Sequence, residues 1–285
     1  RDIFDLHDLA GQSQEILTGA SRVVLPQLLL AGGSPGGARP KVLVGFNPTD
    51  GKIVSGADEL TKGYEHWIVK FSTKGDAPDA GAVEYAYSLM AVAAGVDMPV
   101  TQLFETSEND RFFGVRRFDR DGDRRFHIHT FGNLIQANFR IPSADYSDLL
   151  KATSVLTHNH QDVLRTFRRM VFNVAVHNRD DHVKNFAFIL RGAEGWTLAP
   201  AYDLLPTPGP GGQHTMTVSG EGKNPGRAHM LRAASRSGIT KRQAERVIDE
   251  VRGAAAQWKK FSDQAGVSAA ASREIESSFR DLGGS

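Results

Sequence analysis

The sequence predicts an α+β chain of two lobes, in which a small lobe of sheet and helix precedes a larger, mainly helical lobe. Three observations support this prediction. Short apolar runs bounded by turn residues lie almost entirely before residue 118. Apolar residues at helical spacing dominate after it. The length of 285 residues fits one two-lobed unit or two packed domains better than two independent ones. We therefore expect lobes at 1–118 and 119–285.

Turn-forming residues separate the elements expected in the N-terminal lobe. Residues 3–30 predict a helix, and four Gly and two Pro within 31–41 predict a loop. Residues 82–94 predict one long helix that ends at Gly95. Apolar runs predict four strands, at 42–46, 67–71, 100–105 and 112–118.

The C-terminal lobe is expected to be helical because its apolar residues recur at helical spacing. The clearest helix spans 161–177, and two others are expected at 240–261 and 268–280. Residues 207–229 are rich in Gly and Pro and predict a mobile loop. The apolar face of the helix expected at 161–177 carries Leu164, Phe167, Val171 and Val174.

Composition excludes several classes of function. Hydrophobic residues make up 40% and charged residues 24% of the chain, as in soluble globular proteins. A net charge of +1 gives no support to direct binding of nucleic acid or membrane. The chain has no Cys, which excludes disulfides and Cys-ligated zinc. No apolar run reaches the 18 residues of a membrane span, and no signal peptide is visible, so we expect a cytoplasmic protein.

One segment concentrates the polar chemistry of the chain. Asn178-Arg179-Asp180-Asp181-His182-Val183-Lys184-Asn185 lies between two apolar segments, where charged side chains need a reason. Asp180 and Asn185 stand five positions apart, as the base and the metal-binding amide do in a protein-kinase catalytic loop. Asp181 does not have this spacing. The segment therefore predicts Asp180 as a general base.

A predicted β-hairpin follows this segment and completes the expected site. Strands at 186–190 and 196–200 are joined by a loop of five residues that contains two Gly. Because a hairpin brings its open ends together, Asn185 before it and Asp203 after it are expected side by side. An amide oxygen and a carboxylate are ligands that Mg²⁺ accepts. The pattern is that of a phosphoryl-transfer site.

The N-terminal lobe is expected to supply the phosphate-binding groups. Gly36 and Gly37 offer backbone that a phosphate can approach closely. Lys70 lies in an apolar strand and is the expected partner of the α- and β-phosphates, and Glu84 on the next helix is its expected carboxylate. Residues 115–118 are expected to line an adenine pocket, mostly through backbone groups.

Each of these features also has a simpler interpretation. Asp180 would then cap a turn, and His182 would be a structural His. Lys70 would be an edge residue with a solvated tip, and Glu84 would favour the start of its helix. The Gly-rich loop would be a connection only. The functional interpretation is favoured because all the features occur together and in the order found in kinases.

Taken together, these segments resemble those of the HipA family of bacterial serine/threonine-protein kinase toxins, across most of the chain. The resemblance implies a bilobal, protein-kinase-like fold. The segments that carry it are Gly33–Lys41, His66–Phe71, Arg116–Arg120, Asn178–Asn185 and Pro200–Asp203.

The resemblance implies a role for each matching residue. Asp180 is the catalytic base, Asn185 and Asp203 bind Mg²⁺, and Glu84 pairs with Lys70. Ser34 matches a loop serine that family members autophosphorylate, which inactivates them by displacing the loop. The residues expected to contact ATP are Gly36, Gly37, Ala38, Arg39, Pro40, Lys41, Lys70, Arg116, Arg117, Phe118, His182, Lys184, Asn185 and Tyr202.

The resemblance also implies partners. Family targets are typically aminoacyl-tRNA synthetases, and the partner of a type II toxin–antitoxin pair is a small helix-turn-helix protein, through which DNA is contacted indirectly. Family members usually carry a further N-terminal subdomain, so we expect a short variant, a processed product or a fragment. Arg116 stands where an acidic residue is frequent, and Pro35 adjoins Ser34.

Two other functions remain open from the sequence. A small-molecule kinase would use the same ATP and Mg²⁺ residues. A pseudokinase-like binding module would hold a DNA-bound repressor without catalysis. The presence of all four of the expected ATP and metal residues, Lys70, Asp180, Asn185 and Asp203, argues against the second.

Overall fold

The computed structural model describes residues 6, 8–11, 40–56, 59–72, 76–107, 109–136 and 144–283. The chain forms two compact units. Unit 1 comprises Arg1–Tyr85 and Pro99–Arg125, and unit 2 comprises Ala86–Met98 and Phe126–Ser285. The boundary falls inside helix α3 (Ala80–Ala93), so this helix belongs to both units. The functional division at residue 118 stays a prediction.

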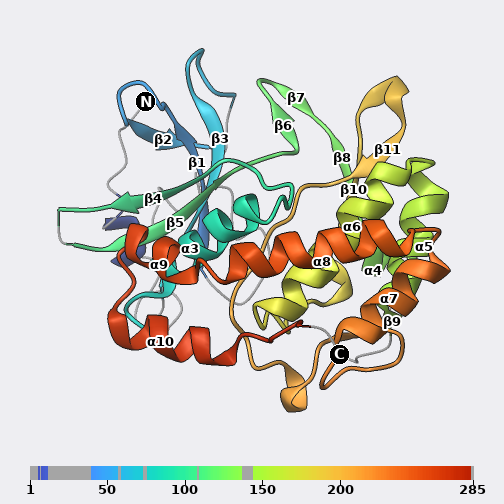
Figure 1. Cartoon of the computed structure of the whole chain (residues 1–285). Coiled ribbons are helices and arrows are strands. Elements are labelled where there is room, and N and C mark those ends of the chain that lie inside the picture. Colours follow the sequence, from blue (N-terminus) through green and yellow to red (C-terminus); the bar gives the residue numbers. More distant parts are fainter. Residues whose placement is uncertain are drawn as a thin grey trace. The chain divides into compact units, whose positions relative to one another are not determined.

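Unit 1 is built on a five-stranded antiparallel sheet in the order β2-β1-β3-β5-β4 (Figure 1). Alternating apolar and polar residues form its strands, as is usual for a sheet with one buried face. Four strands lie where the sequence predicts them, and the short β2 was not predicted. The strands are β1 (Lys41–Phe46), β2 (Ile53–Ser55), β3 (Glu65–Lys70), β4 (Thr101–Glu105) and β5 (Arg111–Arg116). A small hairpin of β6 (Arg120–Asp121) and β7 (Arg124–Arg125) follows in the same unit.

Aromatic side chains form the centre of the unit 1 core. Phe46, Trp67 and Phe104 meet edge to face, with ring centroids 5.0–5.9 Å apart. Leu6 and Leu9 join this core, and residues 8–11 are helical, within the range where a helix was predicted. The rest of the predicted segment 3–30 lies outside the described residues.

Gly114 of β5 leaves room for the ring of Phe104. A Cβ at this position would lie 2.2 Å from that ring, and the ring is packed edge to face against Phe46 and Trp67. We expect Gly114→Ala to lower the free energy of unfolding by about 1–3 kcal/mol, measured by denaturant titration. The control is Gly253→Ala in an exposed helical position with no atom within 4 Å of the new Cβ. It should be neutral or stabilising. Equal losses in the two variants would contradict the packing explanation.

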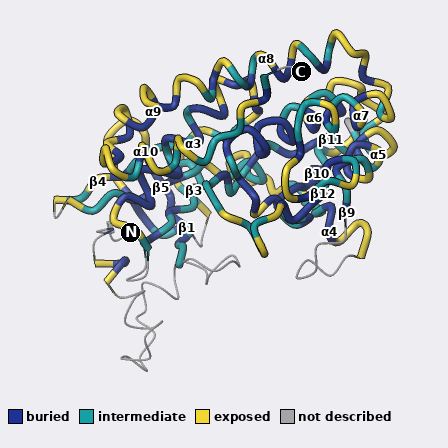
Figure 2. The backbone as a smooth tube through the Cα atoms, turned by 60° about the horizontal axis from the view of Figure 1, so that its bottom comes forward, coloured by how far each residue is buried: buried dark blue, intermediate teal, exposed yellow. Residues whose placement is uncertain are grey.

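Unit 2 is mainly helical, with the buried helix α6 (His160–Ala175) at its centre. This helix contacts both α5 (Tyr146–Thr157) and α8 (Lys241–Ala255), and Figure 2 shows it as mostly buried. Side-chain caps fix where the helices begin: Asn159 accepts a hydrogen bond from the Gln161 N–H at 2.9 Å, and Thr240 forms a capping box with Gln243. The other helices of this unit are α4 (Phe131–Leu134), α7 (Arg227–Arg236), α9 (Trp258–Gln264) and α10 (Ala269–Ser278).

The sequence predicts one helix over 240–261, but the structure has two. Helix α8 ends at Ala255, and α9 begins at Trp258. The break allows the indole of Trp258 to be fully buried, where it donates to the Ser272 carbonyl at 3.0 Å and packs edge to face on Tyr87. Burying such a large side chain outweighs the continuity of the helix.

The predicted hairpin is present as β10 (Ala187–Leu190) and β11 (Trp196–Leu198). A third strand, β8 (His127–Thr130), pairs with β10 and was not predicted. Short strands β9 (Ala144–Asp145) and β12 (Met216–Thr217) pair in parallel. Single turns of 3₁₀ helix lie at Val183–Asn185, Gly192–Glu194 and Pro210–Gly212.

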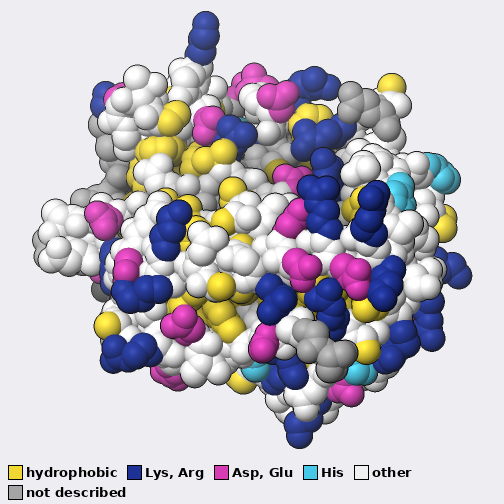
Figure 3. Space-filling model, viewed as in Figure 1, with side chains coloured by type: hydrophobic (Ala, Val, Ile, Leu, Met, Phe, Trp, Pro, Cys, Tyr) yellow, Lys and Arg dark blue, Asp and Glu magenta, His cyan; other side chains and the backbone are white. Residues whose placement is uncertain are grey.

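Charges of both signs alternate on the surface of α8. Arg246 and Arg168 both pair with Glu250, at 2.8 and 2.6 Å. The face seen in Figure 3 shows acidic and basic side chains interspersed in this way. Within the described ranges, no helix is both long and apolar enough to span a membrane.

Candidate active site

The polar segment Asn178–Asn185 is the loop between helix α6 and strand β10. The helix ends because His177 adopts a left-handed φ of 59°. Asn178 then turns the chain back onto the helix: its N–H donates to the Asn173 carbonyl at 2.9 Å, and its side-chain amide donates to the Asn173 side chain at 3.0 Å. The loop is therefore anchored to the most buried helix of unit 2.

Asp180 is the exposed acid of this loop. Its backbone N–H donates to the Thr207 hydroxyl at 2.8 Å, and the Arg179 N–H donates to the same oxygen at 3.0 Å. The surrounding protein excludes enough water to raise the pKa of the Asp180 carboxyl above its ordinary value, and the charges of Asp203 and Asp181 add to this shift, against the effect of His182. An accessible carboxylate with a raised pKa is suited to accepting a proton.

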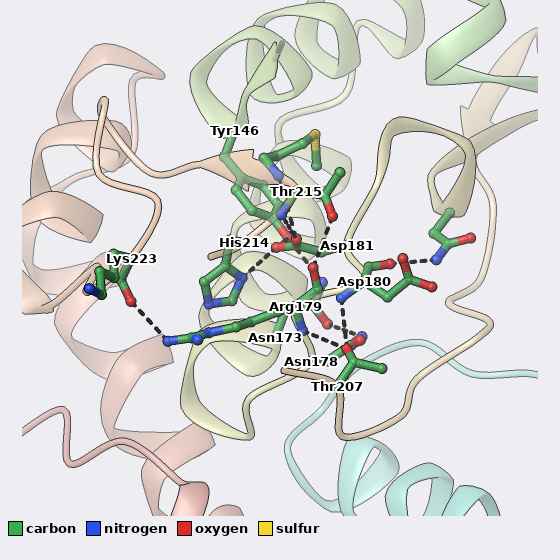
Figure 4. A network of polar contacts seen from close by, with 12 residues as sticks. Tyr146, Asn173, Asn178, Arg179, Asp180, Asp181, Thr207, His214, Thr215 and Lys223 are labelled. Carbon is green, nitrogen blue, oxygen red and sulfur yellow. Dashed lines mark hydrogen bonds and ion pairs between the residues drawn. The ribbon is translucent and has the colours of Figure 1, made fainter. Parts of the chain in front are cut away.

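Asp181 is the buried acid, and its carboxylate is saturated with donors (Figure 4). One oxygen accepts from the Tyr146 hydroxyl at 2.7 Å and lies 2.8 Å from Nδ1 of His214. The other accepts from the N–H of Thr215 at 2.8 Å and that of Met216 at 3.5 Å. With both oxygens engaged and only 1% of the residue exposed, Asp181 is a structural acid.

Asn185 and Asp203 flank the hairpin as predicted. Its ladder continues beyond the strands through the Ala199 N–H and the Ala187 carbonyl, at 2.9 Å, so the two flanks run together. The Asn185 side-chain N–H donates to the Asp180 carbonyl at 2.8 Å, which leaves the amide oxygen as the free acceptor. Asp203 has a left-handed φ of 58°, an unusual backbone state for a residue other than Gly.

These residues fit Mg²⁺. The orientation of the Asn185 amide presents oxygen, and the carboxylate of Asp203 is close enough to Asp180 to raise the pKa of that acid. One amide oxygen and one or two carboxylates are what Mg²⁺ takes from protein, with phosphates and water completing its shell.

His182, Lys184 and Tyr202 make contacts within the loop region. Nδ1 of His182 accepts from the Lys184 N–H at 3.2 Å, and the Tyr202 hydroxyl donates to the Lys184 carbonyl at 2.7 Å. Burial raises the pKa of the Tyr202 phenol to about 12, so it remains a hydrogen-bond donor at neutral pH. Contacts of these three residues with a nucleotide stay a prediction.

The segment after Asp203 is hydrogen-bonded to the loop Asn178–Asn185. The Arg179 guanidinium donates to the carbonyls of Gly212 at 2.6 Å, Pro208 at 3.3 Å and Lys223 at 2.9 Å. Together with Thr207 and Thr215, these contacts hold much of the range that the sequence predicts as a mobile loop. Some Gly and Pro residues of this range, such as Pro208 and Gly212, lie in turns whose carbonyls bind the Arg179 guanidinium.

Unit 1 contains the predicted lysine and its carboxylate. Lys70, at the end of β3, lies 2.5 Å from Oε1 of Glu84 on α3, and the Glu84 side chain is only 3% exposed. Across the sheet, Lys70 is in register with Lys41 of β1, so these two cationic side chains share one face. Like charges directly opposite each other are unfavourable, and the carboxylate of Glu84 offsets this repulsion.

The predicted adenine-binding residues are largely engaged within unit 1. The N–H of Arg116 donates to the Val100 carbonyl at 2.9 Å and that of Arg117 to the His66 carbonyl at 2.8 Å. The Arg116 side chain pairs with Glu65. The Arg117 guanidinium donates to both oxygens of Asp119 at 2.9 and 2.7 Å. Adenine recognition here, including by Phe118, stays a prediction, and these two N–H groups are not available for it.

Part of the predicted site lies outside the described residues, namely Ser34, Gly36, Gly37, Ala38 and Arg39. The described end of that loop includes Pro40, whose carbonyl accepts from the Phe71 N–H at 2.9 Å. Sequence reasoning missed Tyr146, Arg169, Arg179 and His214. Arg179 stands in the polar segment that the sequence singles out, and Arg169 stands beside Arg168 on the predicted helix 161–177, where such a pair is usually surface charge. Tyr146 and His214 had no signal in the sequence.

Comparison with known proteins identifies relatives of this chain. The HipA-like C-terminal domain family matches residues 33–258. Two proteins of Sinorhizobium fredii are similar: Putative kinase Y4dM, 27% identical over 50% of this chain and 37% of that protein, and Putative kinase Y4mE, 33% identical over 45% of this chain and 33% of that protein. The matches thus span about a third of the length of these relatives.

Two solved structures resemble the fold. The HipA of Shewanella oneidensis MR-1, in a toxin–antitoxin complex with HipB and operator DNA, superposes with a TM-score of 0.63 at 15% identity, over 86% of this chain and 62% of that one. The Helicobacter pylori proinflammatory kinase CtkA gives a TM-score of 0.50 at 15% identity, over 86% of this chain and 95% of that one. The mixed α and β fold is therefore kinase-like.

Proposed function

The chain belongs to the HipA-like C-terminal domain family, and from this premise we propose that it is a serine/threonine-protein kinase. The proposed reaction transfers the γ-phosphoryl group of ATP to a protein hydroxyl. One observation carries the proposal. In the loop Asn178–Asn185, Asp180 is exposed, the adjacent Asp181 is saturated with hydrogen bonds, and the Asn185 amide is oriented by the backbone of Asp180.

Asp180 is the proposed general base. Its carboxylate accepts the proton of the incoming hydroxyl as the new oxygen–phosphorus bond forms and the bond between the γ-phosphorus and ADP breaks, so that ADP leaves. Its raised pKa makes it a stronger proton acceptor than an ordinary Asp. The hydrogen bonds of its backbone to Thr207 and Asn185 hold it in place while its side chain remains accessible.

Lys70 and Lys41 are the proposed phosphate-binding cations, and Glu84 orients the ammonium group of Lys70. Asn185 and Asp203 are the proposed ligands of Mg²⁺, which when bound neutralises charge on the phosphates. Asn185 can serve because its N–H is already engaged, and Asp203 because it follows the second strand of the hairpin whose first strand follows Asn185.

The partners of this chain are proposed only from its similarity to related proteins. The HipA of Shewanella oneidensis MR-1 was solved with HipB and its operator DNA, so a helix-turn-helix antitoxin is the proposed partner of this chain. An aminoacyl-tRNA synthetase is the proposed class of substrate, and Ser34 the proposed site of autophosphorylation. Both rest on the family resemblance.

The experiment that tests this function is phosphoryl transfer itself. The purified chain is incubated with Mg²⁺, γ-labelled ATP and a bacterial lysate, and the products are separated by gel and by thin-layer chromatography. We expect label in a discrete protein band, and phosphoserine or phosphothreonine after acid hydrolysis. Label confined to small molecules would contradict protein-kinase activity.

A paired substitution tests the role of Lys70. Lys70→Met alone would leave Glu84 buried without its cation, so we expect the double variant Lys70→Met with Glu84→Gln to keep the fold and lose the phosphate contact. Loss of a charged hydrogen bond of about 1.5–3 kcal/mol corresponds to an increase in the KM for ATP of roughly 10- to 100-fold. Steady-state kinetics and thermal unfolding give the two readouts. An unchanged KM in a folded double variant would contradict the assignment.

A further inference from the structure

Three successive backbone carbonyls around Asn185 each receive a donor from a different element of unit 2. The Tyr202 hydroxyl donates to Lys184 at 2.7 Å, the Arg169 guanidinium donates to Asn185, and the Phe131 N–H donates to Phe186 at 2.8 Å. The segment that carries the proposed amide ligand is therefore held from outside at every residue.

Arg169 is the unusual member of this set. It lies on α6 with 3% of its surface exposed, and a carbonyl, not a carboxylate, receives its hydrogen bond. Its Nε and Nη1 have no hydrogen-bond partner among the described residues. A buried guanidinium with open donors is costly, so its place in the structure calls for an explanation.

The aromatic contacts of Arg169 link both proposed metal ligands. Its guanidinium lies 4.3 Å from the centre of the Phe186 ring and 5.4 Å from that of Tyr202. Phe186 follows Asn185 in the chain, and Tyr202 precedes Asp203. One planar cation thus touches the neighbour of each ligand as well as the Asn185 backbone.

The electrostatics of Arg169 are consistent with this arrangement. Burial lowers the pKa of the Arg169 guanidinium to about 10, and the carboxylates of Asp203 and Asp97 act in the opposite direction. The side chain remains a cation at neutral pH and is buried on α6. Its positive charge can therefore balance the carboxylate of Asp203 from within the protein.

From this geometry we propose that Arg169 is a positioning residue for the metal site, one that sets the spacing of Asn185 and Asp203. This inference rests on the proposed function, because it concerns the ligands named there. Arg169 itself touches neither substrate nor metal. It acts through the Asn185 carbonyl and through the rings of Phe186 and Tyr202.

Arg169→Lys is the informative variant. Lysine keeps the charge and most of the length but loses the planar group that stacks between two rings and reaches the carbonyl. Arg169→Met keeps the apolar bulk and removes the charge. The matched control is Arg168→Lys, on the next residue of α6, which contacts the Ala94 carbonyl at 2.8 Å and Glu250 at 2.6 Å and lies outside the proposed site.

Metal binding is measured directly, without turnover. Mn²⁺ is titrated into each protein in the presence of β,γ-imido-ATP, and free Mn²⁺ is followed by electron paramagnetic resonance. Loss of an outer-shell residue typically weakens metal affinity about 10- to 100-fold, and we expect a change of this size in Arg169→Lys and none in Arg168→Lys. Excess Mg²⁺ should restore much of kcat in Arg169→Lys, which a general folding defect would not allow.

The outcomes separate this inference from the proposed function. If the wild-type protein binds no Mn²⁺ with the nucleotide, the metal assignment fails and this inference fails with it. If the wild-type protein binds Mn²⁺ and Arg169→Lys binds it equally well, only the positioning role is overturned. If Arg169→Met does not fold, Arg169→Lys decides the question alone.

Discussion

Asp180→Asn is expected to abolish phosphoryl transfer to a protein while leaving the fold intact. Asn has nearly the same shape but cannot accept a proton, and a general base contributes about 10²- to 10⁴-fold to a rate. The backbone contacts of Asp180 do not depend on its side chain, since Thr207 and Asn185 bind its N–H and its carbonyl. Transfer of labelled phosphate and thermal unfolding are the two measurements.

The raised pKa of Asp180 determines whether Asp180→Asn increases or decreases the stability of the folded protein. Because the pKa of Asp180 is raised in the folded protein, the folded state holds this proton more strongly than the unfolded chain. Ionisation at neutral pH therefore costs stability, in the window from the ordinary carboxyl pKa up through the raised one. Asp180→Asn removes this cost, so its melting temperature at pH 7 should be unchanged or slightly higher. Exposed Asp123→Asn serves as the control. A variant that transfers phosphate as fast as the wild type would show that Asp180 is not the base.

Asp181→Ala, in contrast to Asp180→Asn, is expected mainly to lower the stability of the protein. It leaves buried donors of Tyr146, His214 and Thr215 without their acceptor. Removing one partner of a buried charged network costs about 3–5 kcal/mol. In a protein of this size that corresponds to a decrease in melting temperature of roughly 10 °C. Differential scanning calorimetry measures it.

Asp180→Ala is the matched control for Asp181→Ala, because the two residues are adjacent and only one is buried. The control should melt near the wild-type temperature and lack activity. If Asp181→Ala melted with the wild type, the Asp181 network would not stabilise the fold as its geometry indicates. Substitution of Asp180 should thus affect mainly activity, and substitution of the adjacent Asp181 should affect mainly stability.

Features with a local signal could be predicted from the sequence. Helix α6 has a clear apolar period, and the hairpin of β10 and β11 has a turn of suitable length between two apolar runs. From these two elements it follows that Asn185 and Asp203 flank one hairpin. The spacing of Asp180 and Asn185 is likewise a local pattern.

Features that depend on distant partners could not be predicted. Strand β8 reads His-Ile-His-Thr, a run of four residues that is too short to stand out in the sequence, and it pairs with the edge of β10 that β11 leaves open. Arg169 looks like surface charge beside Arg168, and only the folded chain shows that two aromatic rings cover it. The buried role of Asp181 depends on Tyr146 and His214, each more than thirty residues away in the chain.

The carbonyls of Lys184, Asn185 and Phe186 have a consequence for the synthesis of the protein on the ribosome. Their donors come from Phe131, Arg169 and Tyr202, which all lie outside Asn178–Asn185. The carboxylate of the adjoining Asp181 accepts hydrogen bonds from the N–H groups of Thr215 and Met216, which come even later in the chain. A nascent chain that has exposed only the residues up to Asn185 therefore lacks several of the contacts that hold this segment in the folded protein. The full set of contacts can form only once the chain through Met216 has emerged.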